Sequence, residues 1–290
     1  MGFNKIEMSG RDTIEKIRKK YNHPLSSHAF SSLYLWQKEM GLSIACDDDF
    51  FVIRCGFKGE NCFFFPCGDL KRKERFIREH MREKNFKLCY MNAADVEFIN
   101  QYFHGCFDIS YDRDSCEYIY DTAELIGMSG GKFAKIRTKL HHLEREHSLH
   151  TEILNAKNRG AAKEIIEAWA QNHEMRDGRP LDDIGVAFRA VNEADTLGLT
   201  GALVYVDGEP YAVTAGCGIS EDSFDLCLAK QKSAVTGLDY YATIELCKII
   251  SSRFAYLNAE EDFGIKGLRI HKNDMRPVKL WEMWEGTPIV

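Results

Sequence analysis

The chain has 290 residues, of which 44% are hydrophobic and 28% are charged, enough apolar material for one large core or two of ordinary size. Its formal net charge of −6 argues against a protein that coats nucleic acid non-specifically, although a local basic face stays compatible with it. No uninterrupted apolar run approaches the ~20 residues of a membrane span, and the first residues lack the apolar segment of a secretory signal. We therefore expect a cytoplasmic protein without an integral membrane segment.

The metal-binding residue types are poorly arranged for a metal site. Ten cysteines are present, and none of them belongs to a C-x-x-C pair. Cys62 and Cys67 lack the second pair or the histidine motif that would indicate structural zinc. The adjacent His141 and His142 point to different sides of a predicted helix. We expect reduced, buried thiols and no metal.

The first half of the chain predicts a hairpin followed by a helix and a strand. The apolar runs at 50–56 and 61–65 flank the turn residues Lys58 and Gly59. The full order expected there is helix 11–20, helix 27–38, strands 50–56 and 61–65, helix 69–83, strand 86–90, helix 94–103 and strand 116–120.

Two predicted helices are markedly basic, at residues 69–84 and 132–145. In the second, Phe133, Ile136 and Leu140 form an apolar stripe at helical spacing, while lysines and arginines occupy most other positions. One interpretation is that both helices present solvated faces with long side chains. The other is contact with a polyanion such as tRNA, whose phosphates bind clustered cations.

The second half contains the clearest local signal, Asp207 and Gly208 between the apolar runs 203–206 and 210–215. A two-residue type I′ turn needs positive φ, which Asp and Gly tolerate. Thr236 and Asp239 fit a capping box before a helix that is apolar on nearly every side. The full order expected is strand 150–154, helix 160–172, a helix from Asp182 or Asp183 to about 194, strands 203–206, 210–215 and 224–229, helix 238–250, strand 254–257, helix 265–271 and strand 278–284.

Both halves contain a hairpin, then a helix, then a strand. We interpret this order as a distant internal duplication. The alternative is that the order is common in α+β proteins and that the match is accidental. With the basic helix 132–145 as a link, the predicted domains are 1–147 and 148–290, and the second is expected to carry the site.

One stretch supports a family resemblance: residues 256–269, which read YLNAEEDFGIKGLR, followed by Lys272 and Pro277. Together with segments 118–121 and 131–137, it resembles the C-terminal domain of phosphatidylglycerol lysyltransferases and related uncharacterised bacterial proteins. The order of elements is similar to tandem GNAT acyltransferase domains and to Fem-type aminoacyltransferases. The resemblance implies an α+β fold (mixed α/β) of two GNAT-like domains, each a mixed, mostly antiparallel sheet flanked by helices.

The resemblance also implies a soluble acyl- or aminoacyltransferase. Such an enzyme moves an acyl or aminoacyl group, from aminoacyl-tRNA or acyl-CoA, to an amine or hydroxyl acceptor. Lysyltransferases carry a large membrane region ahead of this domain, and this sequence shows none, so a lipid acceptor does not follow. The alternative is a non-catalytic tandem module that binds a small metabolite or a protein partner. The donor, the acceptor and the oligomeric state stay open.

Polar residues directly follow the strand 254–257, where the rim of a pocket is expected. Glu260 and Asp262 are the candidate catalytic residues, because either carboxylate could accept a proton or hold the cationic amine of an aminoacyl group. Arg269 lies on the next helix and could meet a phosphate or carboxylate. The alternative is that Glu261 and Asp262 cap that helix, with Arg269 as a salt-bridge partner.

The donor site is less well specified. GNAT enzymes cradle the coenzyme A pyrophosphate with a glycine-rich loop before the main helix. Here the loop 231–237 has a single glycine, and Asp239 adds negative charge to the first helical turn, which weakens the expectation of coenzyme A. Lys230 and Lys232 could still meet a phosphate as point charges. The predicted substrate- and donor-binding residues are Lys230, Lys232, Gly237, Tyr240, Asn258, Arg269 and Lys272.

Overall fold

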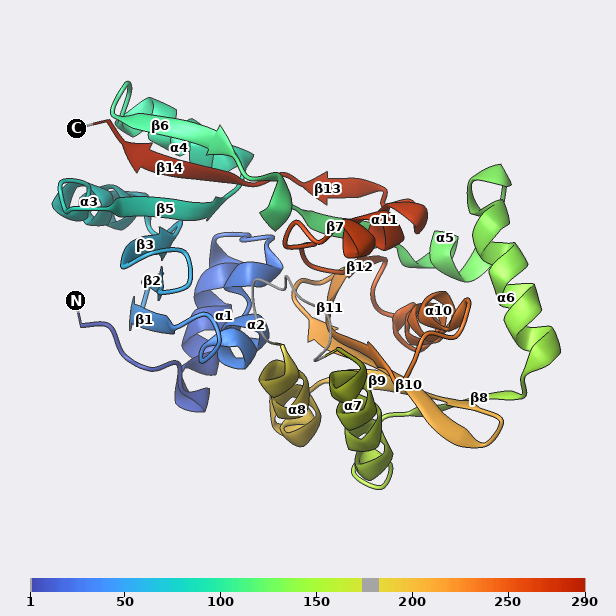
Figure 1. The fold of residues 1–290 in the computed structure, drawn as a ribbon. Coiled ribbons are helices and arrows are strands. Elements are labelled where there is room, and N and C mark those ends of the chain that lie inside the picture. The colour runs from blue at the N-terminus through green and yellow to red at the C-terminus, as the bar shows by residue number, and fades with distance from the viewer. Residues whose placement is uncertain (1, 174–182, 290) are drawn as a thin grey trace. The chain divides into compact units, whose positions relative to one another are not determined.

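The computed structural model describes residues 2–173 and 183–289. The chain divides into two compact units, Met1–Glu117 with Trp281–Val290, and Tyr118–Leu280. Figure 1 follows the chain by colour from the N-terminus to the C-terminus. Within the described residues, no helix is both long enough and apolar enough to cross a bilayer.

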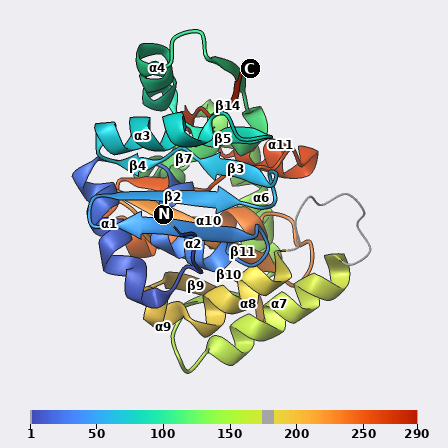
Figure 2. The same ribbon diagram turned by 90° about the vertical axis from the view of Figure 1, so that its left-hand side faces the viewer.

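The first unit is built on a mixed sheet with the strand order β1-β2-β3-β5-β14-β6. β3 and β5 are parallel, and β2 and β3 lie side by side in antiparallel pairing (Figure 2). Phenylalanine rings dominate its core, where Phe63 packs against Phe76 and Phe86. The strands are β1 (Leu42–Asp47), β2 (Phe50–Cys55), β3 (Asn61–Phe64), β4 (Cys67–Gly68), β5 (Phe86–Met91), β6 (Phe107–Tyr111) and β14 (Trp284–Pro288), and the helices are α1 (Arg11–Lys20), α2 (Phe30–Trp36), α3 (Leu70–His80) and α4 (Ala93–Tyr102).

The second unit is built on a sheet with the strand order β13-β7-β12-β11-β10-β9-β8. From β7 to β8 the pairing is antiparallel except between β11 and β12, which run parallel. Its strands are β7 (Glu117–Asp121), β8 (Leu149–Ile153), β9 (Thr200–Val206), β10 (Glu209–Gly218), β11 (Ser223–Gln231), β12 (Tyr256–Asn258) and β13 (Lys279–Trp281), and its helices are α5 (Thr122–Gly127), α6 (Ala134–Glu146), α7 (Arg159–His173), α8 (Ile184–Asn192), α9 (Ala194–Leu197), α10 (Leu238–Ile250) and α11 (Lys266–Asp274).

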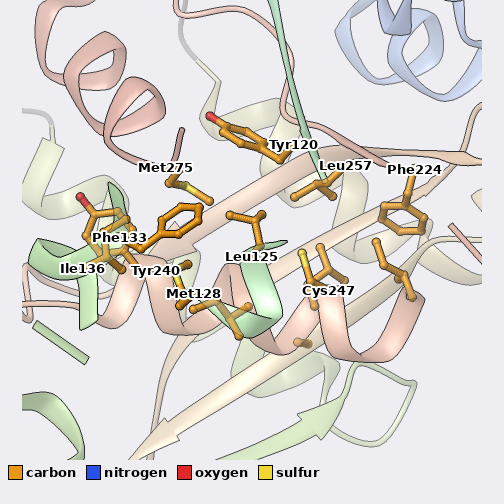
Figure 3. Close-up of a cluster of buried hydrophobic side chains, with 14 of the residues drawn as sticks. Tyr120, Leu125, Met128, Phe133, Ile136, Phe224, Tyr240, Cys247, Leu257 and Met275 are labelled. Atoms are coloured by element: carbon orange, nitrogen blue, oxygen red, sulfur yellow. The ribbon is translucent and has the colours of Figure 1, made fainter. Parts of the chain in front are cut away.

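The core of the second unit forms around α10. Cys247 from this helix packs in one cluster with Leu125 of α5, Ile136 of α6 and Leu257 of β12 (Figure 3). The prediction that this helix is buried is confirmed. Burying an apolar side chain of this size contributes about 1.5–3 kcal/mol, so the cluster fixes α5, α6 and β12 around α10.

The turn and cap predictions had opposite outcomes. The Asp207–Gly208 hairpin is confirmed, with φ of 53° and 87° between β9 and β10. The capping box at Thr236 is wrong. Gly237 is the N-cap of α10 and no side chain caps the helix, because Asp239 turns instead to its neighbour Tyr240, whose backbone N–H it accepts at 2.9 Å.

The division by contacts differs from the boundary predicted at residue 148. β7, α5 and α6 pack within the second unit, although they precede that boundary. The strand predicted at 278–284 is two strands, β13 and β14. β14 returns to the first unit, where it lies between β5 and β6 (Figure 1). The pairing of β7, β13 and β14 therefore determines where the chain divides into two units. The basic composition of α6, which suggested a link between domains, does not.

Candidate functional site

The segment between β12 and α11, residues 259–265, carries both predicted catalytic residues, Glu260 and Asp262. We call it the β12–α11 turn. Two of its non-glycine residues have left-handed backbone, Glu260 with φ of 55° and Phe263 with φ of 50°. Such conformations are costly for bulky residues and persist only where surrounding bonds enforce them.

Asp262 is fully buried and accepts four hydrogen bonds. They come from the Tyr118 hydroxyl at 2.6 Å, Arg269 Nε at 2.9 Å, Arg269 Nη2 at 2.7 Å and the Gly264 backbone N–H at 2.9 Å. Burial raises the pKa of Asp262, but the bonds from Arg269, Tyr118 and Gly264 outweigh it and lower the pKa below its ordinary value. This carboxylate is held ionised and is poorly suited to accept a proton.

Lys272 of α11 binds the backbone of the β12–α11 turn through its ammonium group. Nζ donates to three successive backbone carbonyls, of Ala259 at 2.5 Å, Glu260 at 3.2 Å and Glu261 at 2.6 Å. Burial lowers the pKa of Lys272, and nearby carboxylates oppose that effect only in part. The side chain is 8% exposed and matches its three donors to three acceptors, so it shapes the turn.

Asn258 and Asp225 mark the point where two parallel strands part. They are partners in the ladder, and β11 continues to Gln231 while the chain leaves β12 after Asn258. Asn258 is buried and its Oδ1 accepts the Glu260 backbone N–H at 2.8 Å. Burial raises the pKa of the Cys227 thiol, and the charges of Asp225 and Glu260 raise it further.

Gly237 and Tyr240, both predicted to bind the donor or substrate, lie at the start of α10. Gly237 has φ of 91°, and a Cβ there would lie 2.9 Å from the Lys139 carbonyl oxygen of α6. Tyr240 is buried, its ring lies 4.8 Å from that of His271, and burial raises its pKa to about 12. Asp239 Oδ2 lies 3.1 Å from His271 Nδ1. The α6 backbone therefore packs directly on the first turn of α10.

Lys230 and Lys232 face other elements. Lys230 Nζ lies 2.5 Å from Asp183 and 3.9 Å above the Trp169 ring, so α7 and the start of α8 hold it. Lys232 lies 6.0 Å over the Tyr211 ring of β10. In the part of the chain that the structure describes, no group of three or more His, Cys, Asp or Glu side chains is arranged to hold a metal ion.

Sequence reasoning missed two features of the site. Asp225 lies on the face of β11 opposite to the apolar residues that define the strand, and no neighbouring motif marks it. The Asp239–His271 pair joins residues far apart in the chain, so spacing could not reveal it. A carboxylate inside the otherwise apolar run 224–229 is the one signal in the sequence for Asp225.

The basic helices are partly neutralised. On α3, Arg75 pairs with Glu79 and Arg78 with Glu74, both at 2.8 Å. On the segment before α6, Lys132 pairs with Glu124 at 2.5 Å. Further exposed cations add positive charge to both segments: Lys71, Arg82, Lys84 and Lys135. Both interpretations of these helices therefore stay open.

A protein-family model described as phosphatidylglycerol lysyltransferase, C-terminal, matches residues 18–284. A conserved protein of unknown function from Bacteroides thetaiotaomicron VPI-5482 is similar over 99% of both chains, with 23% identity and a TM-score of 0.88. The structure of L-PGS from Bacillus licheniformis matches 95% of this chain and 91% of its own, with 14% identity and a TM-score of 0.63.

The structure of FemX matches all of this chain and 98% of its own, with 9% identity and a TM-score of 0.59. At these identities the likeness shows the fold. The predicted tandem GNAT-like architecture, with two mixed and mostly antiparallel sheets, is thereby confirmed. The comparison with curated proteins finds no match.

Proposed function

Because the chain belongs to the family of phosphatidylglycerol lysyltransferase C-terminal domains, we propose that it transfers an aminoacyl group from aminoacyl-tRNA to an amine or hydroxyl acceptor. The observation that carries the proposal is the β12–α11 turn. It fixes the backbone of Glu260 in a left-handed conformation through hydrogen bonds with Asn258 and Lys272. Strain that surrounding bonds maintain is typical of functional sites.

The roles divide between reactive and positioning residues. Aminoacyl transfer needs an acceptor that loses a proton and substrates held close together. We assign proton acceptance, or binding of the donor's cationic amine, to Glu260. We assign positioning roles to Asp262 and Lys272, whose bonds within the protein hold the turn. Asn258 fixes the Glu260 backbone from the strand side.

The start of α10 favours aminoacyl-tRNA over acyl-CoA. A pyrophosphate cradle needs open backbone N–H groups at a helix start. Here the α6 backbone lies against Gly237, and Asp239 contributes negative charge in the first turn. We propose that exposed cations on α3 and α6 contact the tRNA phosphates. Acyl-CoA remains the second donor to test.

The test is transfer of a labelled group by the purified full-length protein. Labelled aminoacyl-tRNA and labelled acetyl-CoA are each offered with a panel of amines, alcohols and lipid vesicles. We expect transfer from aminoacyl-tRNA. The substitution Glu260→Gln should reduce this transfer, and the neighbouring Glu261→Gln should leave it intact. Absence of transfer from both donors by folded protein would refute the proposal.

A second candidate is a non-catalytic module that binds a small metabolite or a protein partner. One observation favours it: Lys230, Asp262 and Lys272 all bond within the protein, although the sequence predicted that they face substrates. A thermal-shift series with coenzyme A, acetyl-CoA, amino acids and charged or uncharged tRNA identifies the ligand, and the transfer assay then separates the two candidates. A ligand at ~100 times its Kd adds about 2.7 kcal/mol, whether or not it reacts.

A further inference from the structure

Two cysteines of the first unit lie with their sulfur atoms 3.3 Å apart, Cys62 on β3 and Cys89 on β5. In the parallel ladder, Cys62 is opposite Lys87 and Cys89 is opposite Phe64, so the thiols are diagonal neighbours on one face of the sheet. Both are buried. A disulfide needs a sulfur separation of ~2.05 Å, so the side chains and the local backbone of both strands must shift for the bond to form.

Charged groups surround this thiol pair. Lys58 Nζ donates to Asp112 Oδ2 at 2.7 Å and to Glu285 Oε1 at 3.0 Å. Lys87 pairs with the other carboxylate oxygen of Glu285. The two ammonium groups are thus matched by two carboxylates. They also lie close enough to Cys62 to stabilise a thiolate there.

The two thiols differ in acidity. The hydrogen bond with Cys89 lowers the pKa of Cys62, burial opposes it, and the charges of Lys87 and Lys58 lower it further. Burial instead raises the pKa of Cys89. One sulfur is therefore the better nucleophile, and the other is a neutral thiol within contact distance. Redox-active pairs also combine a low-pKa thiolate with a resolving thiol, but their thiolate is accessible to solvent; here both thiols are buried, so oxidation requires local opening of the sheet.

We propose that Cys62 and Cys89 form a site of reversible oxidation by hydrogen peroxide. The Cys62 thiolate attacks one peroxide oxygen, the O–O bond breaks, and the products are a sulfenic acid at Cys62 and hydroxide. Cys89 then attacks the Cys62 sulfur, a disulfide forms, and the sulfenic oxygen leaves as water with the Cys89 proton. The two sulfurs lose two electrons, and the peroxide oxygens gain them.

The disulfide would join the ends of residues 62–89, the segment that carries α3. Closing this loop removes conformations from the unfolded chain, so the oxidised protein should unfold at a higher temperature than the reduced protein. A small-molecule dithiol should reverse the shift, because it restores both thiols.

The test uses the wild-type full chain. It is treated with hydrogen peroxide, blocked with an alkylating reagent, digested and examined by mass spectrometry. A parallel tube of glutathione confirms that the oxidant is active. The expected result is a peptide that links Cys62 to Cys89 and that a dithiol separates. Retention of both cysteines as alkylated thiols, while glutathione is oxidised, would overturn the proposal.

Variants assign the two roles. In Cys89→Ser, the Cys62 sulfenic acid should persist and react with dimedone, whereas Cys62→Ser should give neither the linked peptide nor a dimedone adduct at residue 89. Cys67→Ser is the matched control, because Cys67 is also buried in the first unit. This variant should give the same amount of the Cys62–Cys89 linked peptide as the wild type. A link from Cys62 to Cys55 instead of Cys89 would overturn the assignment.

Discussion

Acid should destabilise the first unit through its buried histidines. His28 Nε2 lies 2.9 Å from the Phe65 carbonyl, to which it donates, and Nδ1 accepts from the Ser27 hydroxyl at 3.1 Å. These partners suit a neutral ring that donates through Nε2 and accepts through Nδ1. Burial lowers the pKa of His28 to about 3, and it also lowers the pKa of His23, whose ring stacks 4.0 Å away.

The sign of the effect follows from proton uptake. Below the ordinary histidine pKa of about 6.5, the unfolded chain binds a proton at His28, and the folded chain does not until the pH nears about 3. The stability that His28 contributes is therefore full above pH ~6.5 and is lost as the pH falls. Each pH unit below about 6.5 lowers the free energy of unfolding by about 1.4 kcal/mol. Acidification to pH ~4 therefore removes about 3 kcal/mol through His28 alone.

Urea unfolding from pH ~7.5 down to pH ~4 measures this loss. His28→Gln keeps an amide donor for the Phe65 carbonyl but cannot titrate. We expect it to be less stable than the wild type at neutral pH, yet to lose about 3 kcal/mol less on acidification. His104→Gln changes an exposed histidine and should follow the wild type. Equal losses in His28→Gln and the wild type would refute the reasoning.

Three further predictions concern the second unit. Asp262→Ala should cost about 3–5 kcal/mol in urea unfolding, because it leaves Arg269 without its buried partner; unchanged stability would contradict this. Gly237→Ala should cost more than about 1 kcal/mol by the same assay, since positive φ and a close carbonyl both exclude a Cβ. Glu260→Gln should lower kcat/KM for aminoacyl transfer by about 10²-fold with unchanged circular dichroism, whereas a matching loss in Glu261→Gln would contradict its role.

Local signals succeeded where one or two residues decide the backbone. Asp207 and Gly208 both adopt the positive φ that their turn requires, because few other residues tolerate it. The apolar surface of α10 correctly indicated burial. The destination of β14 was not predictable in this way. A strand at the end of the chain carries no mark of its partners, and β5 and β6 lie far away in the sequence.

The candidate site was predicted as a region more accurately than as a set of roles. The polar run after β12 does meet Arg269 and Lys272 of α11, as spacing suggested. Lys230 instead pairs with Asp183 near α7 and α8. A lysine near the end of a strand reads the same in sequence, whether it faces a phosphate or a carboxylate of its own chain.

The distinction between facing a substrate and holding a backbone decides how this site should be understood. Lys272 has three protons and three carbonyl acceptors, and Asp262 has four donors, so both are occupied within the protein. In the sequence, charged residues after a core strand look the same whether they bind a substrate or hold the backbone, because both roles need polar groups at the end of the strand. What these bonds produce is a fixed backbone position for Glu260. We therefore expect the reactive residue of this site to be Glu260, which Asp262 and Lys272 hold in position.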